Sequence, residues 1–568
     1  MSLAELQSAG LLDLLDVELA RALGRIVETS SPEIELAIAL TSRNVRRGHS
    51  CFPIGRSAAE IWPREADRPG DLPDAAWWKD LIAKSPLSRG GPIVLDEAGR
   101  LYLRRYWQLE RDIAQELARR ASISRTIAQD APWLEASLGR LFGDEPDSPQ
   151  RNAALNALRY SVSLLCGGPG TGKTSTVAAI VALIIESRLR QGKDAPRSML
   201  LAPTGKSAAR LAEAVRLAKN RLETSKAVLE QIPEQATTLH RALGLHRDGS
   251  RFRRNADLPL EADLIVVDEA SMVDLGLMRQ LLNAAPLEAT VLIVGDPDQL
   301  SSVEAGSVLR DLVMASAETR WSGRVTLLTR THRYDEKQAL GQLIAAIRQG
   351  DGPRVEALLE RGDAEDVVWA SSARLAAELE RAAAHWARVL RTPTAEEHFD
   401  LRGRYVILSP FRSGRVGTRR LSSAIVDRIR LTEGSEPAVR PIIIEENSHE
   451  LKVYNGDFAM LVEGEPSVAT VQSEADGFRE IAEARLPRYS EAFALSVHKA
   501  QGSEFDEVLL ILPEEDAPML SRELLYTAVS RARHAVRLVG PKHVVAAMLE
   551  RRARRDSGLV DAIAQALG

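Results

Sequence analysis

The sequence has little cysteine and no long apolar run. Cys51 and Cys166 are the only cysteines among 568 residues, too few for the disulfide framework of a small secreted protein and without zinc-ligand spacing. The longest uninterrupted apolar run, residues 177–185, has nine residues, whereas a membrane-spanning helix needs about 20. The first twenty residues are acidic and lack the basic start of a signal peptide. We therefore expect a cytoplasmic protein with no membrane partner.

A large excess of charge is also absent. The 74 basic and 79 acidic residues leave a net charge of −5, which argues against binding nucleic acid by net charge alone but permits a local basic channel. Only 11 of the basic residues are lysines, and Lys173, Lys206 and Lys499 all lie in the motifs described below. Aromatic residues make up 4% of the chain, so any stacking on bases depends on few rings.

The length suits three to four domains of about 150 residues. Residues 1–110 carry apolar residues at helical spacing and predict a small helical domain, followed by a helical linker over 111–148. Strand and helix patterns then alternate, which is typical of α/β proteins with parallel, doubly wound sheets. We expect two such domains, 149–345 and 346–568. Their candidate strands are 162–166, 199–202, 264–267, 291–294 and 325–328 in the first, and 405–408, 508–512 and 536–539 in the second.

Two segments interrupt this alternation. Residues 245–262 predict a small insertion, with a short hairpin over 245–258. Residues 437–490 contain short β-type runs and the pair Asn455-Gly456, which favours a type I′ turn. This second segment predicts a β-rich, barrel-like (SH3-like) insertion in the second α/β domain.

A phosphate-binding loop follows the first strand of the first α/β domain, where the sequence matches G-x-x-x-x-G-K-[ST]. Its residues are Gly167, Gly168, Pro169, Gly170, Thr171, Gly172, Lys173 and Thr174. Glycines let backbone N–H groups surround phosphate oxygens at the start of a helix. We expect Lys173 to reach the β- and γ-phosphates of ATP, and the Thr174 hydroxyl to bind Mg²⁺.

A second nucleotide motif lies about 95 residues further on. The apolar strand ending at Val267 is followed by Asp268 and Glu269. We expect Asp268 to hold Mg²⁺ and Glu269 to orient or deprotonate the attacking water. The two motifs together predict nucleotide hydrolysis.

Six further segments occur in a characteristic order: APTGKSAARL at 202–211, TTLHRALG at 237–244, GDPDQLSSVEAG at 295–306, LTRTHR at 328–333, VHKAQGSEFD at 497–506 and LLYTAVSRAR at 524–533. This order resembles the motif series of superfamily 1 helicases, and the amino-acid sequences of the motifs resemble those of the RecD family. The segments LLDVELA and LAIALTSRNVRRGHSCFPI also resemble the amino-terminal domain of that family. Departures are mild: Ser496 and Ser530 stand where the family usually has Thr, and Ala500 where it often has Ser.

The resemblance implies two RecA-like motor domains and a role for each motif residue. Arg333 and Arg531 would be arginine fingers, Gln299 would sense the γ-phosphate, and Gly502 and Glu504 would lie at the nucleotide. Gln150 either reads the adenine or is an ordinary polar residue at a helix start. The residues that would face single-stranded DNA are Thr204, Lys206, Thr237, His240, His498 and Lys499.

The implied function is that of the ATP-dependent 5′→3′ translocase and helicase subunit of a RecBCD-type helicase–nuclease. Its partners would be single-stranded and duplex-end DNA and RecB-like and RecC-like subunits, with the latter docking on residues 1–110. The alternative is a stand-alone RecD-like helicase, but residues 1–145 lack the helix-hairpin-helix motifs usual there. A nuclease is a third hypothesis. It is disfavoured because the Pro-Asp pairs at Pro73, Pro146 and Pro297 have no (Asp/Glu)-x-Lys partner at usable spacing.

Overall fold

The computed structural model describes most of the chain: residues 2–26, 31–62, 71–123, 132–143, 145, 147–246, 251–319, 321–331, 333, 338–361, 364–392, 394–434, 437–448, 450–473 and 477–567. Within these ranges, no helix combines the length and apolar character needed to cross a bilayer. Pro146 of the linker and residues 247–250 of the small predicted insertion lie outside the described residues.

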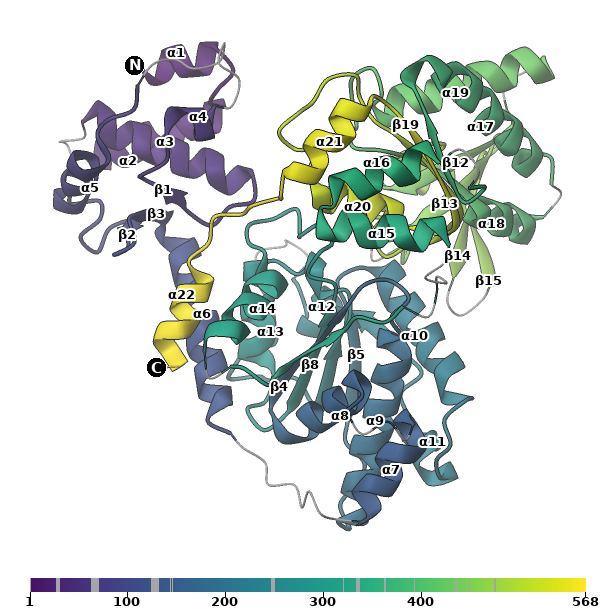
Figure 1. The fold of residues 1–568 in the computed structure, drawn as a ribbon, viewed down its shortest axis with the longest axis horizontal. Coiled ribbons are helices and arrows are strands. Elements are labelled where there is room, and N and C mark those ends of the chain that lie inside the picture. Colours follow the sequence, from purple (N-terminus) through teal and green to yellow (C-terminus); the bar gives the residue numbers. More distant parts are fainter. Residues whose placement is uncertain are drawn as a thin grey trace.

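The amino-terminal region is mainly helical and stands beside the two larger bodies (Figure 1). Trp62, Trp78 and Phe52 are buried in its core. A small antiparallel sheet, in the order β1-β3-β2, accompanies the predicted helices. The elements are α1 Leu3–Ser8, α2 Leu14–Ile26, α3 Pro32–Arg46, β1 Phe52–Pro53, α4 Ala58–Ile61, α5 Ala75–Lys84, β2 Ile93–Leu95, β3 Arg100–Leu103 and α6 Arg104–Ala121. The boundary expected at residue 110 falls inside α6.

The two α/β domains, expected at residues 149–345 and 346–568, are called motor domains 1 and 2 after the role that the resemblance implies. Motor domain 1 contains a six-stranded parallel sheet in the order β6-β5-β7-β8-β4-β9. Its five predicted strands are confirmed, because strands buried on both faces are continuous apolar runs. The strands are β4 Val162–Gly167, β5 Ser198–Ala202, β6 Ala236–Thr238, β7 Leu264–Val267, β8 Thr290–Gly295 and β9 Val325–Leu328. The helices are α7 Pro132–Phe142, α8 Pro149–Arg159, α9 Lys173–Arg190, α10 Gly205–Lys219, α11 Lys226–Gln231, α12 Leu239–Leu243, α13 Leu275–Ala284 and α14 Val308–Glu318.

Two separate cores cover the faces of this sheet. Helices α7 to α11 pack on one face and α6, α12, α13 and α14 on the other. The second core also contains Leu559 and Ile563 of the final helix, α22 Leu559–Leu567. Figure 1 shows α22, in yellow, beside α6 and far along the chain from the rest of this domain.

Motor domain 2 contains a five-stranded parallel sheet in the order β10-β19-β18-β11-β17. Its three predicted strands are confirmed. The strands are β10 Val367–Ala370, β11 Tyr405–Ser409, β17 Leu495–Ser496, β18 Phe505–Ile511 and β19 Ala532–Val539. The helices are α15 Ala339–Gln349, α16 Gly352–Glu360, α17 Leu375–Leu390, α18 Ala395–Arg404, α19 Thr418–Glu433, α20 Arg522–Val529 and α21 Lys542–Glu550. Helix α15 packs into this domain's core, and the boundary expected at residues 345–346 falls inside it.

The β-rich insertion is an antiparallel sheet with its own apolar core, in the order β15-β14-β13-β12-β16. Its strands are β12 Val439–Ile444, β13 Phe458–Val462, β14 Val468–Ser473, β15 Gly477–Ala482 and β16 Tyr489–Glu491. The turn at Asn455-Gly456 is present, since the Asp457 N–H donates to the Tyr454 carbonyl at 2.9 Å. Only Gly456 has a positive φ, 95°, so the type I′ prediction is wrong; one positive φ at this position is typical of a type II turn.

Candidate nucleotide and nucleic-acid site

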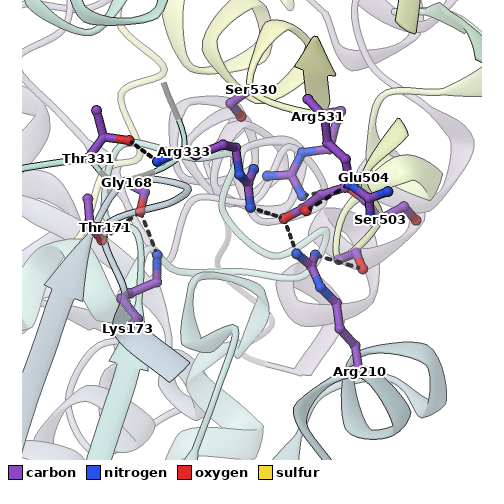
Figure 2. A network of polar contacts seen from close by, with 12 residues as sticks. Gly168, Thr171, Lys173, Arg210, Thr331, Arg333, Ser503, Glu504, Ser530 and Arg531 are labelled. Atoms are coloured by element: carbon purple, nitrogen blue, oxygen red, sulfur yellow. Dashed lines mark hydrogen bonds and ion pairs between the residues drawn. The ribbon is translucent and has the colours of Figure 1, made fainter. Parts of the chain in front are cut away.

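The phosphate-binding loop joins β4 to α9 at the carboxyl edge of the first sheet. Gly170 and Gly172 have φ values of 74° and 81°, which glycine adopts without strain. A Cβ on Gly170 would lie 2.3 Å from the Cβ of Arg333, so the loop needs glycine where motif residues after β9 approach it. The Lys173 ammonium donates to the carbonyls of Gly167 and Gly168 at 2.6 and 2.9 Å (Figure 2). The Lys173 side chain is therefore folded back onto the carbonyls of its own phosphate-binding loop.

Thr174 and Gln150 each lie in the first turn of a helix. Thr174 follows Lys173 in the first turn of α9. Gln150 is in the first turn of α8, which Ser148 caps. Both readings of Gln150 fit this position, and both stay predictions.

Asp268 and Glu269 follow β7 at the same edge of the sheet. Burial and the neighbouring Glu269 raise the pKa of Asp268, because two carboxyl groups this close resist sharing full negative charge. Glu269 has a φ of 51°, an uncommon conformation for a residue with a side chain. Residues held in such sparsely populated backbone conformations cluster at functional sites.

A carboxylate that follows β8 connects the two motor domains. Asp296 is buried, and burial raises its pKa. It accepts hydrogen bonds from Tyr526 of α20 at 2.9 Å and from the Gln299 amide at 3.1 Å. The Gln299 Oε1 atom is buried and has no hydrogen-bond partner among the residues that the structure describes, so this amide keeps an unused acceptor there. The role of Tyr526 was not apparent from the sequence, because no motif spacing links it to Asp296.

Three arginines pair with Glu504 between the motor domains, and Figure 2 labels two of them, Arg210 and Arg333. Arg210 of α10 and Arg333 both donate to its Oε1, the latter at 2.6 Å. Arg533 approaches its Oε2 at 3.5 Å. Burial raises the pKa of Glu504, but the charges of Arg210 and Arg333 outweigh it and lower the pKa to about 2. Arg210 is another residue missed in the sequence, where it reads as one more arginine on a helix.

Arg531 lies beside this cluster with different partners. Its guanidinium is buried and donates to the carbonyls of Thr527 and Ser503 at 3.1 and 3.3 Å. Gly502 precedes Ser503 with a φ of 68°, and a Cβ there would lie 2.6 Å from Ser207 of motor domain 1. The structure thus brings Arg333, Arg531, Gly502 and Glu504 to one interdomain contact.

The residues predicted to face DNA fall into three groups. Thr237 lies on β6, and His240 follows that strand in α12. Thr204 follows β5, which pairs with β6, so these three residues share one edge of the first sheet. The Thr204 hydroxyl caps α10 by accepting from the Ser207 N–H at 3.2 Å. Burial lowers the pKa of His240, which keeps its imidazole neutral at pH 7.

Lys206 and His498 are less open to solvent than their predicted role suggests. The Lys206 ammonium donates to the Ser503 hydroxyl across the interdomain contact, and burial lowers its pKa. Burial also lowers the pKa of His498. Their contacts with DNA stay predictions.

Lys499 lines a cavity of about 330 Å³ between motor domain 2 and the β-rich insertion. Glu445, which directly follows β12, accepts from Lys499 at 2.7 Å and from Arg412 at 2.6 Å, and pairs with Arg488 at 3.3 Å. Burial raises the pKa of Glu445, but Lys499 outweighs it and lowers the pKa to about 2. One carboxylate thus pairs with three of the cations that line this cavity, and Arg419 is the fourth.

We predict that Glu504→Gln destabilises the interdomain contact at neutral pH. The low pKa of Glu504 contributes stability that is complete above about pH 4.5, the ordinary value, and is lost as the pH falls toward 2. The variant should lower the free energy of unfolding by about 1–3 kcal/mol at pH 7. In denaturant titrations, the difference in free energy of unfolding between the variant and wild type should shrink below pH 4.5. Glu514→Gln, at an exposed site in the same domain, is the control, and an unchanged difference across this range would contradict the prediction.

Comparisons with known families and proteins cover nearly the whole chain. Three family models match: the RecBCD enzyme subunit RecD N-terminal domain over residues 8–102, an AAA domain over 150–305 and a UvrD-like helicase C-terminal domain over 491–539. The structure of Bacteroides Pif1 bound to single-stranded DNA is 17% identical, with a TM-score of 0.38 over 70% of this chain and 93% of that one.

Full-length relatives carry the identification. The RecBCD enzyme subunit RecD of Mycobacterium tuberculosis is 39% identical over 97% of this chain and 95% of its own length. That of Haemophilus influenzae is 28% identical over 90% and 88%. The ATP-dependent RecD2 DNA helicase of Deinococcus radiodurans is 29% identical over 87% of this chain and 63% of its own length. Given this identity and coverage and the matching amino-terminal domain, the chain belongs to the RecD family of superfamily 1 helicases.

Proposed function

We propose that this chain is the ATP-driven 5′→3′ single-stranded-DNA motor of a RecBCD-type helicase–nuclease. It would act in the cytoplasm on duplex DNA ends, together with RecB-like and RecC-like subunits. The observation that carries the proposal is the convergence of P-loop and arginine residues between two parallel sheets. Lys173 lies in one domain, and Arg333 and Arg210 meet Glu504 of the other.

The residues present fit ATP and Mg²⁺. The P-loop has the positive φ values of a phosphate cradle, and the buried Gln299 Oε1 has no partner of its own among the described residues. Thr174 and Asp268 would hold Mg²⁺, which when bound neutralises phosphate charge. Burial and Glu269 raise the pKa of Asp268. A bound cation would favour the charged form of its carboxylate.

Lys173, Glu269 and Arg333 would each have a separate role in ATP hydrolysis. Lys173 would leave its loop carbonyls to bind the β- and γ-phosphates, and Glu269 would orient the attacking water. Arg333 would move from Glu504 to the γ-phosphate, because a terminal phosphate is a stronger partner for guanidinium than one carboxylate shared with Arg210. Exchange of partners at Glu504 would then link nucleotide binding to the approach of the domains.

DNA would lie along the carboxyl edges of the two sheets, from Thr204 and Thr237 to Lys499. Contacts to the backbone phosphates give grip without sequence readout, which a translocating motor requires. A DNA phosphate would replace Glu445 as the partner of Lys499 and Arg412. We therefore place the β-rich insertion, which carries Glu445, beside the DNA.

Lys173→Gln should reduce DNA-stimulated ATP hydrolysis by at least about 10³-fold while leaving the fold intact. The amide cannot supply the positive charge that stabilises the transferring phosphoryl group. Steady-state hydrolysis with and without single-stranded DNA measures the loss. Lys193→Gln, at an exposed lysine beyond the same helix, is the control. Near wild-type turnover by the Lys173 variant would refute the nucleotide site.

Translocation should run 5′→3′, as the RecD resemblance implies. The test uses oligonucleotides that carry biotin–streptavidin at one end. A motor moving toward the 3′ end displaces streptavidin from that end faster, and this displacement should require ATP. Faster release from the 5′ end would contradict the assignment.

The amino-terminal domain should dock on a RecC-like subunit through the exposed side of α2. Leu14 and Leu15 are 62% and 63% exposed, so the domain's own core does not use them. Leu15→Glu would place an unpaired charge in an apolar interface and weaken association by more than about tenfold. Gel filtration of co-expressed subunits measures this, with Leu431→Glu on α19, where Leu431 is 84% exposed, as control. Equal co-elution of both variants would refute this docking surface.

A further inference from the structure

Residues 551–558 form an extended strap that leaves motor domain 2 after α21 and returns to motor domain 1 at α22 (Figure 1). Leu559 and Ile563 of α22 are fully buried in the core of motor domain 1. Along the way the strap contacts the amino-terminal domain, where Asp556 pairs with Arg56 and its backbone bonds to Ser50. One short segment therefore joins all three parts of the chain.

Arg555 is the strap residue that contacts the loop after Gln299. Its guanidinium donates to the backbone carbonyls of Ser302, Glu304 and Gly306, the last at 2.8 Å. These carbonyls belong to a loop without regular structure, and the planar fork of an arginine can bond several of them at once. Removing Arg555 would leave these acceptors without that donor.

The amino-terminal domain closes the other side of this contact. Gly48 has a φ of 88°, and a Cβ at this position would lie 2.6 Å from the Arg555 guanidinium carbon. The Gly48 carbonyl accepts from the Gly306 N–H at 2.9 Å. The guanidinium is thus enclosed between the amino-terminal domain and the loop.

The opposite end of the same loop is held by motor domain 2. The Leu300 N–H donates to the Thr527 hydroxyl at 2.9 Å, and the Leu300 carbonyl accepts from the Gln501 amide at 2.9 Å. Gln299, the preceding residue, therefore depends on a loop fixed at Leu300 by one domain and at residues 302–306 by Arg555. A shift at the second attachment would reach Gln299 through Ser301 and Leu300, the two residues that separate it from Ser302.

We propose that Arg555 is a positioning residue for ATP hydrolysis: by holding residues 302–306 against Gly48, it fixes the loop that orients Gln299 toward the nucleotide. This inference rests on the proposed function. It also makes the amino-terminal domain part of the support of the nucleotide site, since Gly48 and Asp556 belong to the same contact. Arg555 itself touches no reacting atom.

The test is the Arg555→Ala variant of the full chain, assayed with saturating single-stranded DNA. We expect kcat for ATP hydrolysis to fall about tenfold, while the Kd of a fluorescent ADP analogue stays within about twofold of wild type, because an interaction needed only in the transition state is lost. Arg555→Lys, which keeps a charge and fewer directed donors, should recover part of the rate. Added ethylguanidinium should raise the rate of Arg555→Ala, which a general loss of folding would not allow.

Arg552→Ala is the matched control, since Arg552 is an exposed arginine on the same strap. The inference is overturned if Arg555→Ala keeps its kcat, if Arg552→Ala loses as much, or if kcat and ADP affinity fall together without rescue. If Arg555→Ala does not fold, the comparison of Arg555→Lys with wild type decides by the same two measurements. A wild-type chain without DNA-stimulated hydrolysis would instead defeat the proposed function, so the two failures are distinguishable.

Discussion

The interdomain contact depends on the need to pair positive charge in a place with little water. Arg210 and Arg333 come from motor domain 1, and Arg531 and Glu504 from motor domain 2. Gathering guanidinium groups in a partly buried cleft is unfavourable unless an anion lies among them. Glu504 supplies that anion. This cluster constrains how the two sheets are placed, because each sheet must carry its motif loop to it.

A second carboxylate pairs cations in the same way beside the β-rich insertion. Glu445 holds Lys499 and Arg412 beside the β-rich insertion, as Glu504 holds Arg333 and Arg210 at the nucleotide cleft. In both places a side-chain carboxylate stands where a phosphate-bearing ligand would find its cations. The cations of both clusters are therefore already paired within the protein, and under the proposed function ligands would bind by exchanging partners with these two carboxylates.

Local patterns in the sequence predicted the parts of the fold whose structure is decided locally. Strands such as Val162–Gly167 are covered on both faces, so their apolar runs are continuous and visible. Strands β6 and β17 have three residues or fewer, and three of the four residues of β10 are only partly buried, so these strands leave no such signal. The Asn455 turn was assigned the wrong type because it lies at the end of the long connection between β12 and β13, whereas the preference for type I′ belongs to two-residue loops that join paired strands directly. Lys206 sits in a recognisable motif, yet its contact with Ser503 lies 297 positions away, and no local pattern contains such a contact. The same holds for Arg555 and for the return of α22.

That return has a consequence for biosynthesis. Ribosomes release the strands of motor domain 1 long before residues 559–567, and domains generally begin to fold as they emerge. Leu559 and Ile563 complete one of the two cores on that domain's sheet, so the nascent domain exposes an apolar surface on α6 and α14 throughout translation of motor domain 2. Helix α22 can cover this surface only after residues 559–567 have been synthesised and have left the ribosome, so until then the surface would be open to a chaperone that binds apolar segments.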